Sequence, residues 1–159
     1  AYARTPDYIR LHIVASSDSA ADQAIKLEVR DAIRAYAGNL LTLCESADDA
    51  YRCIEENLVS FQTVAQNAAY RAGLTGEVRL ELGTFEFPDR VYGEELVPAG
   101  RYRAMRVLLG EADGGNWWCV VYPNLCLPED EKPEAEIQFY SSFGEWIQRF
   151  FFGQEETRT

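Results

Sequence analysis

The sequence predicts a single α+β domain in which a mainly antiparallel sheet of about four strands is packed by two N-terminal helices, with an aromatic C-terminal helix after it. Three observations predict this fold. Several short segments alternate apolar and polar residues with a period of two, and two early segments repeat apolar residues every three or four positions. The chain has 159 residues, of which 47% are hydrophobic, enough for one core and too few for two. We therefore expect one domain over 8–126, after an N-terminal remnant at 1–7.

The N-terminal half predicts a strand and two helices. Ile9, Leu11 and Ile13 alternate with Arg10 and His12, which is typical of a half-buried strand. Ser and Asp residues then supply helix-capping side chains, and Gly-Asn supplies a stop signal. The expected helices span 20–37 and 47–72.

The C-terminal half predicts further strands. Alternation over 78–82 indicates a strand with one solvated face, and the aromatic segment 83–92 indicates an edge strand. An extended run follows to Leu109, and Asp113 and Gly114 lie in a turn before Trp117. This order predicts a β-hairpin whose second strand begins at Trp117.

The last part of the chain predicts a linker and a helix. Residues 127–136 are acidic and contain proline, which is typical of a solvated linker. Residues 137–152 repeat large apolar side chains at helical spacing, and three roles are open for this stripe: packing on its own domain, contact with a partner or second copy, or a membrane interface. The stripe consists of Ile137, Tyr140, Phe143, Trp146, Ile147, Phe150 and Phe151.

The charge disfavours two classes of partner. The chain has 26 acidic and 15 basic residues and a formal net charge of −11. Nucleic-acid affinity depends on Lys and Arg neutralising phosphates, so we expect no DNA or RNA partner. Anionic membrane surfaces are disfavoured for the same reason.

Four cysteines permit three pairings, of which the two short-range ones are geometrically natural. The disulfide candidates are Cys44 with Cys53 and Cys119 with Cys126. Free buried thiols are the alternative. A four-thiolate zinc site is disfavoured because its cysteine pairs are usually two to four residues apart.

No arrangement of residues predicts catalysis strongly. His12 is the single histidine of the chain, so a thiolate nucleophile with a histidine base would have to pair Cys119 with His12. A small cysteine hydrolase of this kind is our alternative function. Motifs for phosphate loops, calcium loops and zinc proteases do not occur, so we expect no cofactor, no metal, no catalytic residue and no small-molecule substrate.

Two adjacent tryptophans indicate a binding surface. Trp117 and Trp118 lie on one predicted strand, so their side chains point to opposite faces of the sheet. One then fills the core, and the other is a candidate anchor for a partner protein. Arg10, His12 and Asp18 are expected near the same strand end as further contact residues.

The order of several long blocks resembles the stage II sporulation protein R family of spore-forming Firmicutes. The blocks are I-R-L-H-I-V-A-S-S-D-S at 9–19, D-Q-A-I-K-L-E-V-R-D-A at 22–32, F-P at 87–88, Y-G at 92–93, P-A-G-x-Y at 98–102 and N-W-W-C-V-V-Y-P-N-L-C at 116–126.

The resemblance implies a secreted signalling protein with no catalysis of its own. Such a protein is exported, which implies an export segment before residues 1–7, into the space between forespore and mother cell. There it would activate a membrane-bound sporulation aspartic protease that removes the pro-sequence of sigma factor E. That protease is the partner that the resemblance implies.

Overall fold

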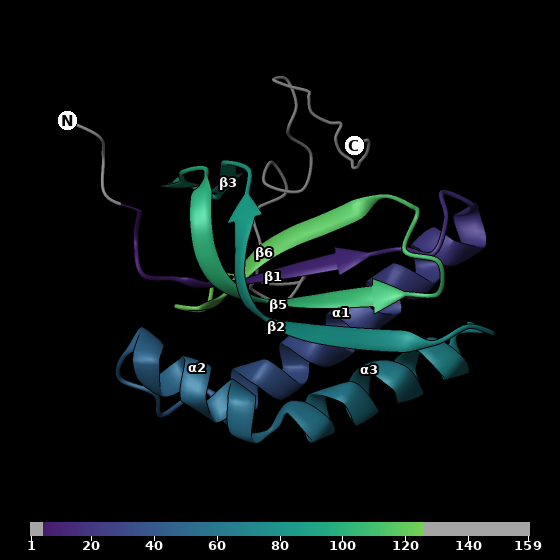
Figure 1. Ribbon diagram of the computed structural model, residues 1–159, viewed down its shortest axis with the longest axis horizontal. Coiled ribbons are helices and arrows are strands. Elements are labelled where there is room, and N and C mark those ends of the chain that lie inside the picture. The colour runs from purple at the N-terminus through teal and green to yellow at the C-terminus, as the bar shows by residue number, and fades with distance from the viewer. Residues whose placement is uncertain (1–4, 126–159) are drawn as a thin grey trace.

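The computed structural model describes residues 5–125 and shows a four-stranded sheet with three helices on one face (Figure 1). The predicted α+β class is confirmed. In chain order the elements are β1 (Ile9–Val14), α1 (Ala20–Leu40), α2 (Ala47–Glu56), α3 (Leu58–Arg71), β2 (Val78–Phe87), β3 (Arg90–Tyr92), β4 (Glu95–Val97), β5 (Gly100–Leu109) and β6 (Asn116–Tyr122).

The sheet has the strand order β2-β5-β1-β6. β1 runs parallel to β5 and antiparallel to β6, and β2 runs antiparallel to β5. β3 and β4 pair only with each other in a separate two-stranded sheet, which lies on the face opposite the helices (Figure 1). The first strand of the chain is therefore an inner strand of the sheet.

The predicted hairpin between β5 and β6 is wrong, although the turn that joins them was placed correctly. The two strands lie on either side of β1 and do not pair with each other. The turn pairs with the end of β1 instead, since Ala15 N donates to Gly115 O and Gly114 N donates to Ala15 O. β1 thus lies directly beside β5, in the position that β6 would occupy if β5 and β6 formed a hairpin.

The first helix starts where its capping pattern predicted it. The Ser19 side chain accepts from Asp22 N at the start of α1, as expected of a Ser N-cap. The helix continues through Gly38 to Leu40, three residues past the predicted end. No conformation with positive φ is adopted at Gly38, so this glycine does not terminate the helix.

The predicted helix over 47–72 is two helices, because Asn57 interrupts it. The Asn57 side chain donates to Cys53 O at 2.8 Å, and its backbone N donates to Ile54 O. An asparagine that bonds to nearby backbone competes with helix continuation. The break allows α2 and α3 to cover different parts of the sheet (Figure 1).

The main core lies between the helices and the sheet. The side chains of Ile9, Leu11 and Ile13 on β1 pack there with Phe61 of α3. A smaller cluster on the opposite face contains Phe87, Val97, Tyr102, Ala104 and Val120. β1 is consequently buried on both faces, and the expectation of a half-buried strand is wrong.

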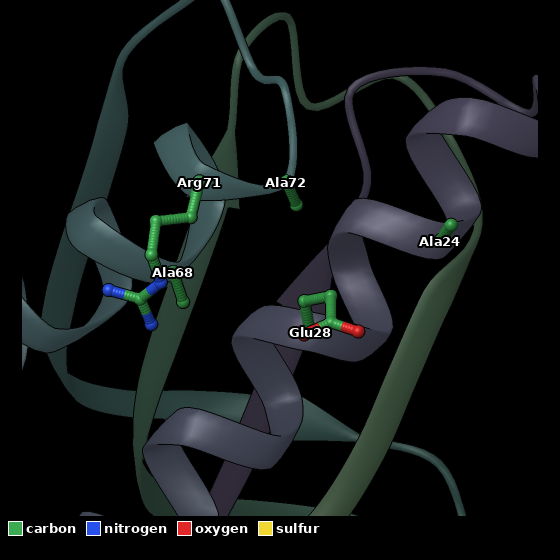
Figure 2. Close-up of a pocket in the computed structure, with 5 residues that line it drawn as sticks. All are labelled: Ala24, Glu28, Ala68, Arg71 and Ala72. Atoms are coloured by element: carbon green, nitrogen blue, oxygen red, sulfur yellow. The ribbon is translucent and has the colours of Figure 1, made fainter.

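An open groove of about 380 Å³ lies between α1 and α3 (Figure 2). Its small side chains are Ala24, Ala68 and Ala72, and its charged ones are Glu28 and Arg71. Figure 2 shows the two charged residues on different helices of the groove. This groove is on the helix layer, across the sheet from Trp118.

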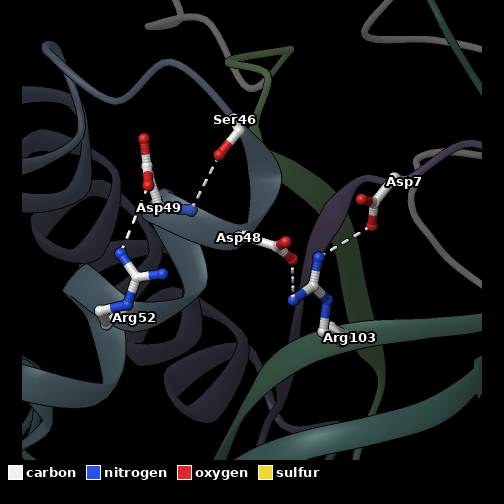
Figure 3. Close-up of polar contacts among 6 residues, drawn as sticks. All are labelled: Asp7, Ser46, Asp48, Asp49, Arg52 and Arg103. Atoms are coloured by element: carbon white, nitrogen blue, oxygen red, sulfur yellow. Dashed lines mark hydrogen bonds and ion pairs between the residues drawn. The ribbon is translucent and has the colours of Figure 1, made fainter.

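One arginine fastens three parts of the chain together. Arg103 on β5 forms ion pairs with Asp7, before β1, and with Asp48, in the first turn of α2, each at 2.9 Å (Figure 3). Burial opposes its charge, but the hydrogen bonds to both carboxylates outweigh burial and raise the pKa of Arg103. Its guanidinium also lies 5.1 Å from the ring centre of Tyr51. The N-terminal segment and α2 are thereby tied to the sheet.

Candidate functional site

The two neighbouring tryptophans point to opposite faces of the sheet, as predicted. Trp117 packs against the main core, with the guanidinium groups of Arg30 and Arg34 at 5.5 and 5.9 Å from its ring centre. Trp118 packs against the smaller cluster on the other face and is half-buried. Trp118 is therefore the tryptophan available on the face that the helices leave uncovered.

Trp118 is held in place by the single histidine. The rings of His12 and Trp118 are stacked, with centroids 3.8 Å apart and an interplanar angle of 11°. Asn116 Oδ1 lies 2.8 Å from His12 Nε2, and because this oxygen only accepts, Nε2 donates the hydrogen. Arg90 of the β3–β4 hairpin lies with its guanidinium 5.7 Å from the Trp118 ring centre. We call Trp118, His12, Asn116 and Arg90 the Trp118 corner.

Burial keeps the histidine neutral. His12 is 8% exposed, and burial, with the positive charges of Arg106, Arg90 and Lys26, lowers its pKa from 6.5 to about 4 even though the bond to Asn116 opposes the shift. A neutral ring at neutral pH stacks on Trp118 without carrying a charge into the buried face. His12 thus positions Trp118 and is not itself an exposed contact residue.

This pKa shift predicts a pH-dependent stability. Because the folded pKa lies below the unfolded one, the unfolded chain binds the proton more strongly, and the stabilisation present above pH 6.5 is lost as the pH falls towards about 4. The loss is on the order of 3 kcal/mol. Urea unfolding of wild type and His12→Gln at several pH values measures it. Between pH 6.5 and about 4 the free energy of unfolding should fall less in His12→Gln than in wild type. An equal pH dependence of the two proteins would contradict the prediction.

Arg10 is completely buried on the same face as His12. It is 0% exposed, and its guanidinium lies between two aromatic rings, 4.5 Å from the centre of Phe87 and 4.7 Å from that of Tyr102. Nη1 donates to Pro88 O at 3.2 Å. Nε and Nη2 are buried and have no hydrogen-bond partner within residues 5–125. Arg10, which was predicted as a contact residue, is therefore a fully buried cation.

The β3–β4 hairpin packs on the same face of the sheet as Arg10, in the cluster that contains Phe87 and Tyr102. Tyr92 and Val97 face the sheet within the smaller cluster, and Val97 is 0% exposed. Val91 and Leu96 pair across the two strands and are each 60% exposed. The hairpin thus has one face against the domain and one apolar face towards solvent.

Asp18 lies beyond the opposite end of β1 from Arg10. It follows the end of β1, whereas Arg10 is at the start of that strand, and its side chain lies against the β5–β6 turn: a Cβ added at Gly115 would be 3.4 Å from Asp18 Oδ1. The serine-rich segment around Asp18 is locked to this turn, because Gly114 touches the backbone of Ser17. The structure does not bring Asp18 together with Arg10 and His12.

The Cys119 and His12 hydrolase is excluded by the sheet geometry. Cys119 is the register partner of Leu11, and His12 is the register partner of Trp118. Because directly paired residues share a face and neighbours alternate, Cys119 points to the helix side and His12 to the other side. A base on the opposite face cannot take a proton from this sulfur.

The remaining cysteine predictions have separate outcomes. Cys44 and Cys53 are free thiols in the structure, so the predicted bridge between them is not formed there. Cys53 nevertheless lies beside Cys44, and burial together with this neighbour raises the pKa of the Cys44 thiol. Cys119 is disulfide-bonded, and because Cys126 lies outside the described residues, its identity as the partner stays a prediction. The predicted linker at 127–136 and helix at 137–152 also lie outside them.

The part of the chain that the structure describes contains no group of three or more His, Cys, Asp or Glu side chains able to hold a metal ion. None of its helices is both long and apolar enough to cross a membrane.

The aromatic neighbours of Arg10 were missed by sequence reasoning. Phe87 and Tyr102 lie on predicted strands, but nothing local indicates that they enclose Arg10, which is 77 and 92 positions away. The signal in the sequence is that the polar positions of the first strand hold a large cation and a histidine, Arg10 and His12. Of the β3–β4 hairpin, only β3 falls within the predicted edge strand at 83–92, and β4 was not predicted.

Comparison with known proteins identifies the family. Residues 5–132 match the family described as Stage II sporulation protein R. Over 127 residues the chain is 35% identical to the protein named Stage II sporulation protein R of Bacillus subtilis strain 168, and the aligned region covers 80% of this chain and 57% of that relative. The chain thus spans little more than half of the relative's length, and no solved structure matches it. This chain belongs to the stage II sporulation protein R family.

Proposed function

We propose that this protein is a secreted sporulation signal that activates a membrane-bound aspartic protease, which then removes the pro-sequence of sigma factor E. The site of action is the space between forespore and mother cell. The observation that carries the proposal is the family match, which extends over residues 5–132 and so includes the whole described domain. The activity itself is what the resemblance to this family implies.

The geometry supports a role in recognition. The neutral ring of His12 stacks on Trp118. Cys119, which pairs with the neighbouring residue Leu11, faces the other side of the sheet. Aromatic and arginine side chains are enriched where proteins bind one another, and the Trp118 corner offers one of each, Trp118 and Arg90. We propose the Trp118 corner as the surface that meets the protease.

Co-expression tests the function. The chain is produced together with the candidate protease and the precursor of sigma factor E, and the precursor and processed forms are separated by electrophoresis. Processing is expected only when all three proteins are present. Equal processing with and without this chain would reject the proposal.

In the same assay, Trp118→Ala is expected to reduce processing at least tenfold, because loss of an interface anchor costs on the order of 2 kcal/mol or more. The matched control is Tyr70→Ala. Tyr70 lies on α3 in the helix layer and is 48% exposed, so its removal should leave processing unchanged.

Because Trp118 also packs on His12, its removal can lower the amount of folded protein. Arg90→Ala tests the same corner at an exposed side chain. Circular dichroism on each variant reports folding. Wild-type processing by both folded variants would show that the protease contacts a different surface.

A further inference from the structure

We propose that Arg10 is a binding site for a carboxylate of a partner protein, reached when the β3–β4 hairpin moves aside. The proposal adds a chemical requirement for the partner to the function proposed above. It begins with the two nitrogens of Arg10 that lack hydrogen-bond partners within the described residues.

These two nitrogens lie on one edge of the guanidinium. Nε and Nη2 point their hydrogens in the same direction, whereas Nη1, on the other side, already donates to Pro88 O. Two parallel N–H groups match the two oxygens of a carboxylate, and such bidentate pairs are the strongest that arginine makes. The free edge is therefore the one suited to a carboxylate.

The surroundings of Arg10 leave its charge unpaired. Within residues 5–125 no ion pair involves Arg10, and its guanidinium contacts the backbone oxygen of Pro88 and the rings of Phe87 and Tyr102. Aromatic faces attract the cation but accept no full hydrogen bond. A buried charge with unused donors is unfavourable. A carboxylate that enters would pair with the Arg10 charge, and the low polarity of the site would strengthen their attraction.

The β3–β4 hairpin packs on the face of Arg10 without joining the four-stranded sheet. β3 and β4 have three residues each and share no backbone ladder with the four-stranded sheet. An isolated two-stranded hairpin is only marginally stable. Its contacts with the domain include the exposed hydrogen bond from the Tyr8 hydroxyl to Glu95 at 2.9 Å, the Arg90 guanidinium near the Trp118 ring and the buried side chain of Val97. The hairpin can thus move without breaking any strand pairing of the main sheet.

The outer face of the hairpin gives a partner a point of contact. Val91 and Leu96 form an exposed apolar pair on the side away from Arg10. A partner that binds this pair and carries an acidic side chain nearby would both displace the hairpin and supply the carboxylate. The partner chemistry that fits is therefore an acidic segment with an adjoining apolar surface.

Acetate is the probe that tests the site. The ¹⁵N-labelled chain is titrated near neutral pH with sodium acetate, and separately with sodium chloride at the same ionic strength, while the arginine Nε–Hε resonances are followed. The Arg10 resonance is expected to shift saturably with acetate and not with chloride. Arg10→Lys keeps the charge but loses the planar edge. Because this variant has no Nε–Hε group at position 10, its response is followed at the backbone amides of Phe87 and Tyr102, whose acetate-dependent shift in wild type should be lost.

Arg79→Lys is the matched control. Arg79 is an exposed arginine on β2 whose register partner, Leu108, pairs in turn with Val14 on the same face as Arg10. This variant should retain the saturable response. An Arg10 resonance that behaves identically in acetate and chloride, or a response that persists in folded Arg10→Lys, would overturn the proposal. If Arg10→Lys does not fold, the wild-type titration alone decides, and neither result depends on the processing assay.

Discussion

Gly114→Ala is expected to lower the free energy of unfolding by about 3 kcal/mol, a large loss for one added methyl group. A Cβ at this position would lie 2.3 Å from Ser17 O and 2.4 Å from Ser17 C. Both are backbone atoms, so no side-chain rotation relieves the clash. The β5–β6 turn would have to leave the end of β1, where Gly114 N bonds to Ala15 O.

Urea unfolding at neutral pH measures this loss, with Gly38→Ala as the control. A Cβ added at Gly38, inside α1, would meet nothing within 4 Å. Alanine in a helix is favoured over glycine by roughly 0.5–1 kcal/mol, so this variant should be more stable than wild type. Equal stability of the two variants would show that the close contact at Gly114 is absent in solution.

Phe61→Ala is the second change with a large expected effect, a loss of about 3–5 kcal/mol of folding free energy. Phe61 on α3 is 0% exposed within the main core. Its ring meets that of Tyr36 on α1 edge to face, with centroids 4.8 Å apart. Removing it leaves a cavity where two helices and the sheet meet.

Val59→Ala is the control for this core variant. Val59 lies two residues earlier on α3 and is 81% exposed, so its shortening should change stability by less than about 0.5 kcal/mol. Thermal and urea unfolding should place Phe61→Ala far below both wild type and Val59→Ala. A Phe61→Ala midpoint near wild type would mean that α3 does not pack on the sheet as described.

The sequence predicted those elements whose signals are local. Ser19 and Ser46 each accept a hydrogen bond from the residue three positions on, and both helices start there. The alternation of Ile9, Leu11 and Ile13 correctly predicted a first strand whose three apolar side chains share one face, although the other face is buried as well. Such features depend on spacing within one segment, which the sequence displays directly.

Features that depend on distant pairing were predicted less well. The turn at Asp113 and Gly114 was located, but the strand inserted between β5 and β6 begins more than a hundred residues earlier. The break at Asn57 depends on the hydrogen bond that its side chain donates to the backbone oxygen of Cys53. Hydrophobic periodicity does not reveal such a bond. Turn signals alone therefore identify where the chain reverses and not which strand lies beside it.

The candidate site was predicted in part for the same reason. Alternation correctly placed Trp117 and Trp118 on opposite faces. It gave no indication that Arg10 is enclosed by Phe87 and Tyr102, because that enclosure needs β2, β5 and the β3–β4 hairpin to assemble around β1. Burial of a charged residue is a property of the finished sheet.

The inner position of β1 also affects how the chain acquires its structure during synthesis. The register partners of Ile9, Arg103 and Tyr122, are synthesised 94 and 113 residues after it. Such long-range pairing makes folding slow. β1 therefore cannot form its strand pairs until both β5 and β6 have been translated.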